Sequence, residues 1–201
     1  HTLQGMLKQF NILHPDPSGV AGDLELGIDT IRKRSEGLLK FTETYRNLNK
    51  ITKAELARVF ISGLFDNIQR LMQPTLDQKN IEITVILKDP LVSVEMDAGL
   101  IEQVLINLVL NAIDAVKNQE EPKIVLSAYT DNDSKVIIKV ADNGTGMSED
   151  VLEQIFIPFF STKKNGNGIG LSLCKQIMMV HKGSITVQSK VNEGTAFYLR
   201  F

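Results

Sequence analysis

The sequence has no tryptophan, one cysteine and almost balanced charge, with 24 acidic and 22 basic residues. The single cysteine, Cys174, excludes an internal disulfide and fits a reducing compartment. A net charge of −2 implies no strongly basic surface, so we expect no nucleic-acid partner. The longest uncharged apolar run, residues 104–113, is shorter than a membrane span. With no secretory signal in view either, we expect a soluble chain.

Three of the 14 glycines form a cluster that is informative about function. Glycines alternate with other residues at 166, 168 and 170, and an amphipathic run follows at 171–180. Backbone N–H groups at a helix start form a site for anionic oxygens, and glycine lets a ligand approach them closely. Lys163 and Lys164 precede the cluster, and either could meet a phosphate. The cluster alone indicates either a phosphate-binding loop or an ordinary turn.

The first quarter of the chain is helical in pattern. Residues 23–48 carry a heptad seam, which predicts a long helix that needs a partner, either residues 2–11 or another subunit. Residues 12–22 indicate a loop, because they contain two prolines and two glycines. Residues 49–60 are interpreted as a linker with a helical turn.

The rest of the chain mixes helix and strand patterns. Helices are predicted over 61–79, 97–117 and 171–181, with Asp97 capping the second, and strands over 81–87, 92–96, 123–130, 134–140, 184–191 and 196–201. A turn at Asp89-Pro90 separates the first two strands. Residues 141–170 are predicted to form a long loop, typical of a lid or binding loop. This order predicts an α+β fold, a two-layer sandwich of a mixed sheet with helices on one face.

Two asparagines stand out on the helix predicted over 97–117. Asn107 and Asn111 lie four residues apart and therefore share one face, which Asp114 and Ala115 continue. Amides are costly to bury without a hydrogen-bonding partner. An amide oxygen is a suitable ligand for Mg²⁺, which takes few protein ligands. The alternative is that both amides bond to neighbouring backbone.

An acidic residue ends the strand predicted before the long loop. Asp142 is followed by Gly144 and Gly146. A buried carboxylate there could accept a hydrogen bond from the amine of adenine, worth about 1.5–3 kcal/mol. The alternative is a turn or calcium aspartate. A Walker-type loop is excluded, because no Gly-Lys-Ser/Thr begins a helix.

Five motifs in order carry a resemblance to a known family. They read EQVLINLVLNAIDA at 102–115, DNGTGM at 142–147, IF-PFFSTK at 155–163 with Ile157 between its parts, GNGIGL at 166–171 and GTAF at 194–197. They resemble the N box, first glycine box, phenylalanine box, second glycine box and closing motif of sensor histidine kinases, which are Bergerat-type (GHKL) ATPases. His181-Lys182-Gly183 before a strand also fits, and residues 31–39 resemble the second dimerisation helix of nitrogen-regulation-type kinases.

The resemblance implies a domain organisation. Residues 1–50 would be part of a helical dimerisation hairpin, residues 51–60 a linker and residues 61–201 the catalytic ATP-binding domain with a Bergerat fold. None of His1, His14 and His181 has the setting of a phosphoacceptor, which is a bundle helix with an adjacent acid and a proline a few residues later. The phosphoacceptor helix would therefore be largely absent, and the histidine would be supplied by another chain.

The resemblance also implies ATP and Mg²⁺ as cofactors and gives residues their roles. Asn111 would bind Mg²⁺, Asp142 would bind the adenine amine, and Lys163 would approach the γ-phosphate. Asn107 and Lys163 would be the catalytic residues. The residues expected to contact ATP are Asn107, Asn111, Ala115, Asp142, Gly144, Gly146, Met147, Thr162, Lys163, Gly166, Gly168, Ile169, Gly170, Leu171 and Thr195.

The function so implied is transfer of the γ-phosphoryl group of Mg-ATP to a histidine on a dimerisation domain. A response regulator would act downstream, the full-length protein would be a homodimer, and this chain would be the cytoplasmic portion of a membrane-anchored sensor kinase. ATP-hydrolysing members of the superfamily usually have a glutamate where Asn107 stands, and an amide cannot act as a base. The alternatives are a GHKL-type ATPase and a non-catalytic nucleotide-binding module.

Two residues depart from the family pattern. Ile157 stands where the phenylalanine box commonly has glutamate, which leaves the behaviour of the lid open. Asp114 stands where many kinases carry a basic residue that touches phosphate, although the Asn-Ala-x-Asp-Ala form resembles the nitrogen-regulation subgroup.

Overall fold

The computed structural model describes residues 22, 26–32, 35, 54–163 and 166–201. The chain divides into two compact units, His1–Asn47 and Leu48–Phe201. Every described residue of the first unit is helical, and an ion pair of 2.7 Å joins Asp29 to Arg32 one turn later. The rest of the predicted heptad helix and its partner segment lie outside the described residues.

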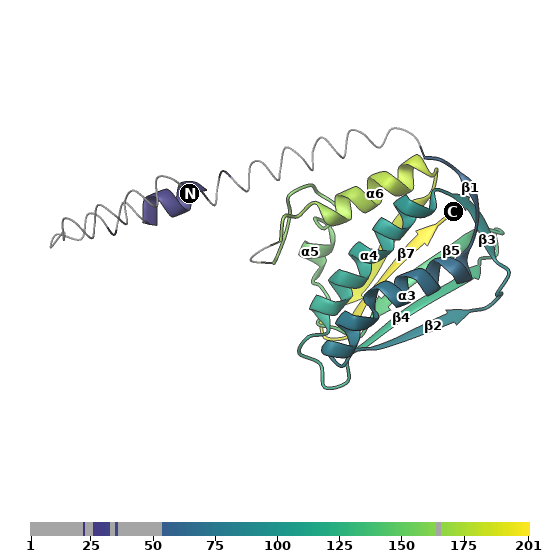
Figure 1. Cartoon of the computed structure of the whole chain (residues 1–201), viewed down its shortest axis with the longest axis horizontal. Coiled ribbons are helices and arrows are strands. Elements are labelled where there is room, and N and C mark those ends of the chain that lie inside the picture. Colours follow the sequence, from purple (N-terminus) through teal and green to yellow (C-terminus); the bar gives the residue numbers. More distant parts are fainter. Residues whose placement is uncertain (1–21, 23–25, 33–34, 36–53, 164–165) are drawn as a thin grey trace. The chain divides into compact units, whose positions relative to one another are not determined.

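The second unit is a five-stranded sheet with helices packed on one face (Figure 1). The strands run in the order β2 (Glu82–Leu87), β4 (Lys123–Thr130), β5 (Val136–Asp142), β7 (Gly194–Arg200) and β6 (Ser184–Lys190). β2 and β4 are parallel and the other pairs antiparallel. The covering helices are α3 (Ile61–Gln78), α4 (Ala98–Ala115) and α6 (Gly170–Val180). The predicted two-layer α+β fold with a mixed sheet is thereby confirmed.

Residues 57–60 differ from the sequence-based expectation. They form a strand, β1 (Ala57–Phe60), so the helical turn predicted in the linker is wrong for this segment. β1 pairs antiparallel with β3 (Ser93–Met96), which supplies the backbone hydrogen bonds that a helical turn would have supplied locally. Val59 also packs against the core. The strands on either side of Asp89-Pro90 consequently belong to different sheets.

Helix α4 forms the centre of the core. Seven of its residues are buried: Ile101, Val104, Leu105, Leu108, Val109, Ala112 and Ile113. The helix is long and apolar enough to cross a membrane by length and composition, but its apolar stripe is enclosed here by the domain. As predicted, the Asp97 carboxylate caps it by accepting a hydrogen bond of 3.1 Å from the backbone N–H of Leu100.

The start of α4 is tied to the end of α6. The backbone N–H of Asp97 donates to Nε2 of His181 at 3.0 Å, and Nδ1 of His181 lies 2.7 Å from the carbonyl oxygen of Ile177. Both ring nitrogens of this histidine therefore have structural partners.

The long loop predicted over 141–170 is shorter in the structure. β5 continues to Asp142, a short helix α5 (Glu149–Leu152) interrupts the segment, and α6 begins at Gly170. The last strand, β7, begins at Gly194, whose φ of 103° favours glycine. A Cβ atom added there would lie 2.1 Å from the carbonyl oxygen of Asp142.

We expect Gly194→Ala to lower the free energy of unfolding by roughly 1–3 kcal/mol, because it combines backbone strain with a steric clash. Gly63→Ala is the matched control: Gly63 lies exposed inside α3 with nothing within 4 Å of an added Cβ. This control should stabilise the protein by about 0.5–1 kcal/mol. Urea denaturation followed by circular dichroism measures both, and equal effects of the two substitutions would contradict the analysis.

Candidate functional site

The predicted site residues follow one face of α4. Asn107, Asn111 and Ala115 are spaced by four residues and span about 12 Å along the helix axis. At one end of this face, the loop after β5 contacts Ala115. At the other end, the start of α6 contacts Asn107, and Lys163 contacts Asn111. The structure therefore brings the N-box residues together with residues of both glycine boxes.

Asp142 lies at the Ala115 end of this face. It is the last residue of β5 and pairs with Thr195 of β7. Its Oδ1 atom accepts a hydrogen bond of 2.8 Å from the backbone N–H of Gly144. Burial raises the pKa of Asp142 to about 6, although the backbone N–H groups of Gly144 and Thr195 favour the ionised form. This carboxylate is thus a half-buried acceptor that titrates close to neutral pH.

The first glycine box packs against the end of α4. The backbone N–H of Thr145 donates to the carbonyl oxygen of Ala115 at 3.2 Å. A Cβ atom on Gly144 would lie 2.6–2.7 Å from Ala115 atoms, so a larger residue cannot replace this glycine without displacing the loop. This contact fixes the position of Asp142 relative to α4.

Thr195 is buried in a small hydroxyl network that the sequence reasoning missed. Ser189 Oγ lies 2.9 Å from Thr195 Oγ1 and accepts a hydrogen bond of 2.9 Å from the backbone N–H of Met147. Ser189 is the register partner of Thr195 in the β6–β7 pair. In the sequence, Ser189 is only a serine in a strand of alternating pattern. Its contact with Thr195 depends on the register of the β6–β7 pair, which local sequence patterns do not predict.

Asn143 is a second residue that sequence reasoning left without a role. Its Oδ1 accepts from the backbone N–H of Lys123 at 2.8 Å, and its Nδ2 donates to the carbonyl oxygen of Glu121 at 2.7 Å. The side chain therefore anchors the turn after β5 to the start of β4. Its neighbour Asp142 is positioned by the same anchor.

At the other end of the face, Asn107 is enclosed by α6. Its Nδ2 donates to Sγ of Cys174 at 3.2 Å, so its partner is a thiol on a distant helix and not the neighbouring backbone. A Cβ atom on Gly170 would lie 2.2 Å from Asn107 Oδ1, which explains the need for glycine there. Burial raises the pKa of Cys174 to about 12, so this thiol is protonated and, as predicted, a core residue.

Asn111 and Asp114 both contact the ammonium group of Lys163. Lys163 Nζ donates to Asn111 Oδ1 at 2.8 Å and to Asp114 Oδ2 at 2.6 Å. Lys163 and Asp114 are both exposed. The two oxygen atoms lie one helical turn apart, and both point to the same positive charge.

The second glycine box leads directly into α6. The carbonyl oxygen of Gly168 accepts from the backbone N–H of Phe159 at 2.7 Å, and Ile169 and Leu171 pack inward. Within the described part of the chain, no side chain caps the first turn of α6. Its backbone N–H groups are thus positioned for an anionic ligand. Gly166 and Thr162 lie in the exposed segment before this turn.

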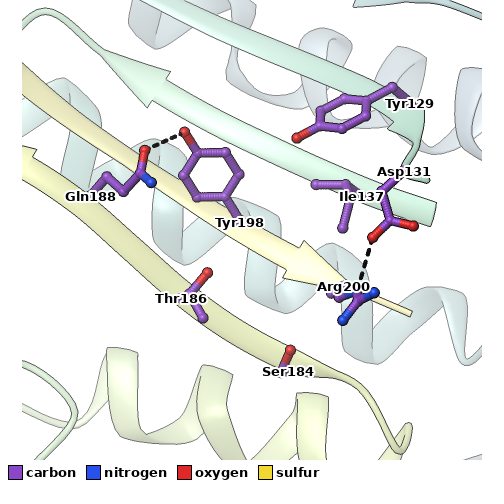
Figure 2. Close-up of a pocket in the computed structure, with 8 residues that line it drawn as sticks. All are labelled: Tyr129, Asp131, Ile137, Ser184, Thr186, Gln188, Tyr198 and Arg200. Carbon is purple, nitrogen blue, oxygen red and sulfur yellow. Dashed lines mark hydrogen bonds and ion pairs between the residues drawn. The ribbon is translucent and has the colours of Figure 1, made fainter. Parts of the chain in front are cut away.

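One open hollow in the surface lies elsewhere. Its lining residues alternate with core residues along β4, β5, β6 and β7, so it is on the sheet face away from the helices (Figure 2). Residues 198 and 200 of β7 and Asp131 contribute to it. None of the predicted site residues lines this hollow. Among the described residues there is also no cluster of three or more His, Cys, Asp or Glu side chains that could hold a metal.

Known proteins resemble this chain in both sequence and structure. The sequence pattern of the family described as histidine kinase-, DNA gyrase B- and HSP90-like ATPases matches residues 96–201, just over half of the chain. The sensor histidine kinase ZraS of Escherichia coli is 29% identical over 198 residues, 98% of this chain and 41% of ZraS. The kinase AtoS of Escherichia coli is 31% identical over 172 residues, 86% of this chain and 27% of AtoS. The chain thus spans less than half the length of these relatives.

Solved structures give the same result. The catalytic domain of the histidine kinase ThkA is 34% identical, with a TM-score of 0.65, over 73% of this chain and 95% of that domain. ThkA in complex with the response regulator protein TrrA is 26% identical, with a TM-score of 0.67, over 98% of this chain and 55% of the ThkA chain. The chain therefore belongs to the family of histidine kinase-, DNA gyrase B- and HSP90-like ATPases, and within it to the histidine kinases.

Proposed function

We propose that this chain is the ATP-binding catalytic region of a sensor histidine kinase, and that it transfers the γ-phosphoryl group of Mg-ATP to a histidine on a dimerisation domain. One observation carries the proposal. A single face of α4 joins a half-buried carboxylate, Asp142, at one end to two amides, a lysine and a glycine-rich helix start at the other. This arrangement suits a ligand with a base at one end and phosphates at the other.

The adenine end follows from the position of Asp142. Its half-buried carboxylate would accept a hydrogen bond from the adenine amine, since one of its oxygens already accepts from Gly144 and the group keeps further acceptor capacity. Ala115, Gly144, Gly146, Met147 and Thr195 would border the base. Gly144 touches Ala115, and Met147 is linked through Ser189 to Thr195.

The phosphate end follows from Asn111, Lys163 and the start of α6. Asn111 would hold Mg²⁺ through its amide oxygen, and the fit is supported by the two side-chain oxygens that already converge on an ammonium group. When bound, Mg²⁺ supplies neutralisation of phosphate charge. Lys163 would approach the γ-phosphate, with Thr162 beside it. The backbone N–H groups of Gly166, Gly168, Ile169, Gly170 and Leu171 would bind phosphate oxygens.

Asn107 favours phosphoryl transfer over hydrolysis. Its amide cannot take a proton from water, and its Nδ2 is occupied by Cys174. Asn107 and Lys163 would thus act by positioning and charge stabilisation, which phosphoryl transfer mainly requires.

The partners are part of the proposal. His181 is a poor phosphoacceptor, because both of its ring nitrogens have backbone partners, and His1 and His14 lie outside the described residues. The acceptor would be a histidine on a dimerisation domain, probed best with that domain from the full-length protein. A response regulator would act downstream, as the ThkA–TrrA complex suggests by analogy. The full-length protein would be a homodimer, with this region on the cytoplasmic side of a membrane-anchored kinase.

The first test is phosphoryl transfer itself. We expect the chain, mixed with radiolabelled ATP, Mg²⁺ and its dimerisation domain, to label that domain on histidine, while the chain alone releases phosphate slowly. Asn111→Ala should remove most of the metal-dependent turnover. Rapid phosphate release without the acceptor would instead indicate a GHKL-type ATPase, and no nucleotide binding at all would contradict both activities.

The second test concerns Asp142. We expect Asp142→Ala to weaken ATP binding by about one to two decades, because a hydrogen bond to a charged group is lost. GTP is the control ligand, since guanine presents a carbonyl oxygen in place of the amine and gains nothing from the carboxylate. Isothermal titration calorimetry measures both ligands, and unchanged ATP affinity would refute the adenine assignment.

The third test uses pH. Since the pKa of Asp142 is raised to about 6, its carboxyl group becomes protonated as the pH falls through this value. The adenine amine favours the ionised form, so ATP affinity should rise between pH 5 and 7.5 and then level off. Asp142→Asn is the control, because titration of the ATP phosphates affects ATP binding equally in this variant and in the unmodified chain. The part of the pH dependence that only the unmodified chain shows is therefore due to Asp142. Identical profiles for the two proteins would contradict the prediction.

A further inference from the structure

Asp114 has no role in the site as proposed so far. It lies three residues after Asn111 on α4, and its carboxylate forms an ion pair of 2.6 Å with Lys163. Lys163 reaches it from the loop before α6, 49 residues further along the chain, and also donates to Asn111 at 2.8 Å. The lysine that would serve the γ-phosphate is thus already bound to a carboxylate and to the amide that would serve the metal.

This ion pair contributes little to the stability of the fold. The side chains of Lys163 and Asp114 are 44% and 58% exposed, and such exposed pairs are typically worth about 0–1 kcal/mol. Asp114 is also absent from the hydrophobic core. Its effect on a charged ligand is larger, because it is a fixed negative charge directly beside the expected phosphate position.

Lys163 cannot neutralise two anions equally well. An ammonium group is a compact point charge, so a phosphate that binds it must compete with Asp114. A nucleotide without a metal would also place its own negative charge near the carboxylate, where like charges repel each other. Both effects weaken binding of the free nucleotide. A nucleotide that arrived with a divalent cation would avoid them, because the cation would supply the positive charge that the oxygens of Asn111 and Asp114 now receive from Lys163.

We propose that Asp114 makes this site selective for metal-bound over metal-free nucleotide. It holds Lys163 against Asn111 when the site contains no nucleotide, and it releases Lys163 only when another cation compensates its charge. The inference rests on the proposed function, because it assumes that nucleotide phosphates bind beside Asn111. Asp114 is in this sense a specificity-determining residue and not a catalytic one.

Asp114→Asn tests the inference, because it removes the charge and keeps the shape of the side chain. We expect its affinity for ATP in EDTA to increase by about three- to tenfold. Its affinity for ATP in Mg²⁺ should stay within about twofold of the unmodified chain. The ratio of the two dissociation constants, measured by calorimetry at one ionic strength, should therefore shrink. Asp66→Asn, the same change at an exposed position of α3, is the matched control and should leave the ratio unchanged.

Two results would overturn the inference alone, and a third would overturn it together with the proposed function. If the unmodified chain binds Mg-ATP but Asp114→Asn leaves the ratio unchanged, Asp114 has no such role and the proposed function stands. If Asp114→Asn instead weakens binding of Mg-ATP more than tenfold without affecting metal-free ATP, Asp114 acts directly on the metal and not on selectivity through Lys163. Failure of the unmodified chain to bind ATP in either buffer would overturn the proposed function together with this inference. Thermal melting, expected to be unchanged, confirms that the variants are folded.

Discussion

The structure depends on helix α4, which supplies residues both to the hydrophobic core and to the candidate site. One stripe of this helix supplies seven buried residues to the core, and the neighbouring stripe presents Asn107, Asn111 and Ala115 to the candidate site. Because the core stripe is closely packed, the polar stripe cannot rotate or slide. The separation of the two ends of the site is therefore set by helix geometry, and both glycine boxes must adapt to it. They do so by direct contact, Gly144 against Ala115 and Gly170 against Asn107.

The sheet holds Asp142, the residue proposed to bind adenine, at an energetic cost. The β5–β7 pair places Asp142 beside Thr195, in a setting where burial raises its pKa to about 6. A carboxyl group whose pKa is higher in the folded than in the unfolded state stabilises the fold at low pH, below its unfolded pKa, and loses that contribution as the pH rises through 6. Near neutral pH this carboxyl group is mostly ionised while half-buried, and the fold is less stable there than it would be with the group protonated at low pH. Such costs are typical of functional sites and are consistent with a ligand-binding role for Asp142.

Sequence patterns predicted the long elements well, because their signals are local. The apolar periodicity of α3, α4 and α6 and the alternation of β4 to β7 gave their positions to within a few residues. β1 escaped prediction because it has four residues and depends on pairing with β3, more than thirty residues later. Contacts between residues far apart in the sequence were also not predicted, because local patterns do not contain them. Cys174 as the partner of Asn107, and Ser189 beside Thr195, follow from packing and register. Asp114 was visible only as an acid where many kinases have a basic residue.

Asp114 changes how charge is distributed in the candidate site. Where a basic residue on α4 would hold phosphate permanently, Asp114 leaves α4 without a cation at this position. The compensating charge comes from Lys163, on the segment that leads into the second glycine box. The electrostatics of the proposed phosphate end therefore depend on where this segment lies, while Asp142, at the proposed adenine end, is held by the β5–β7 pair.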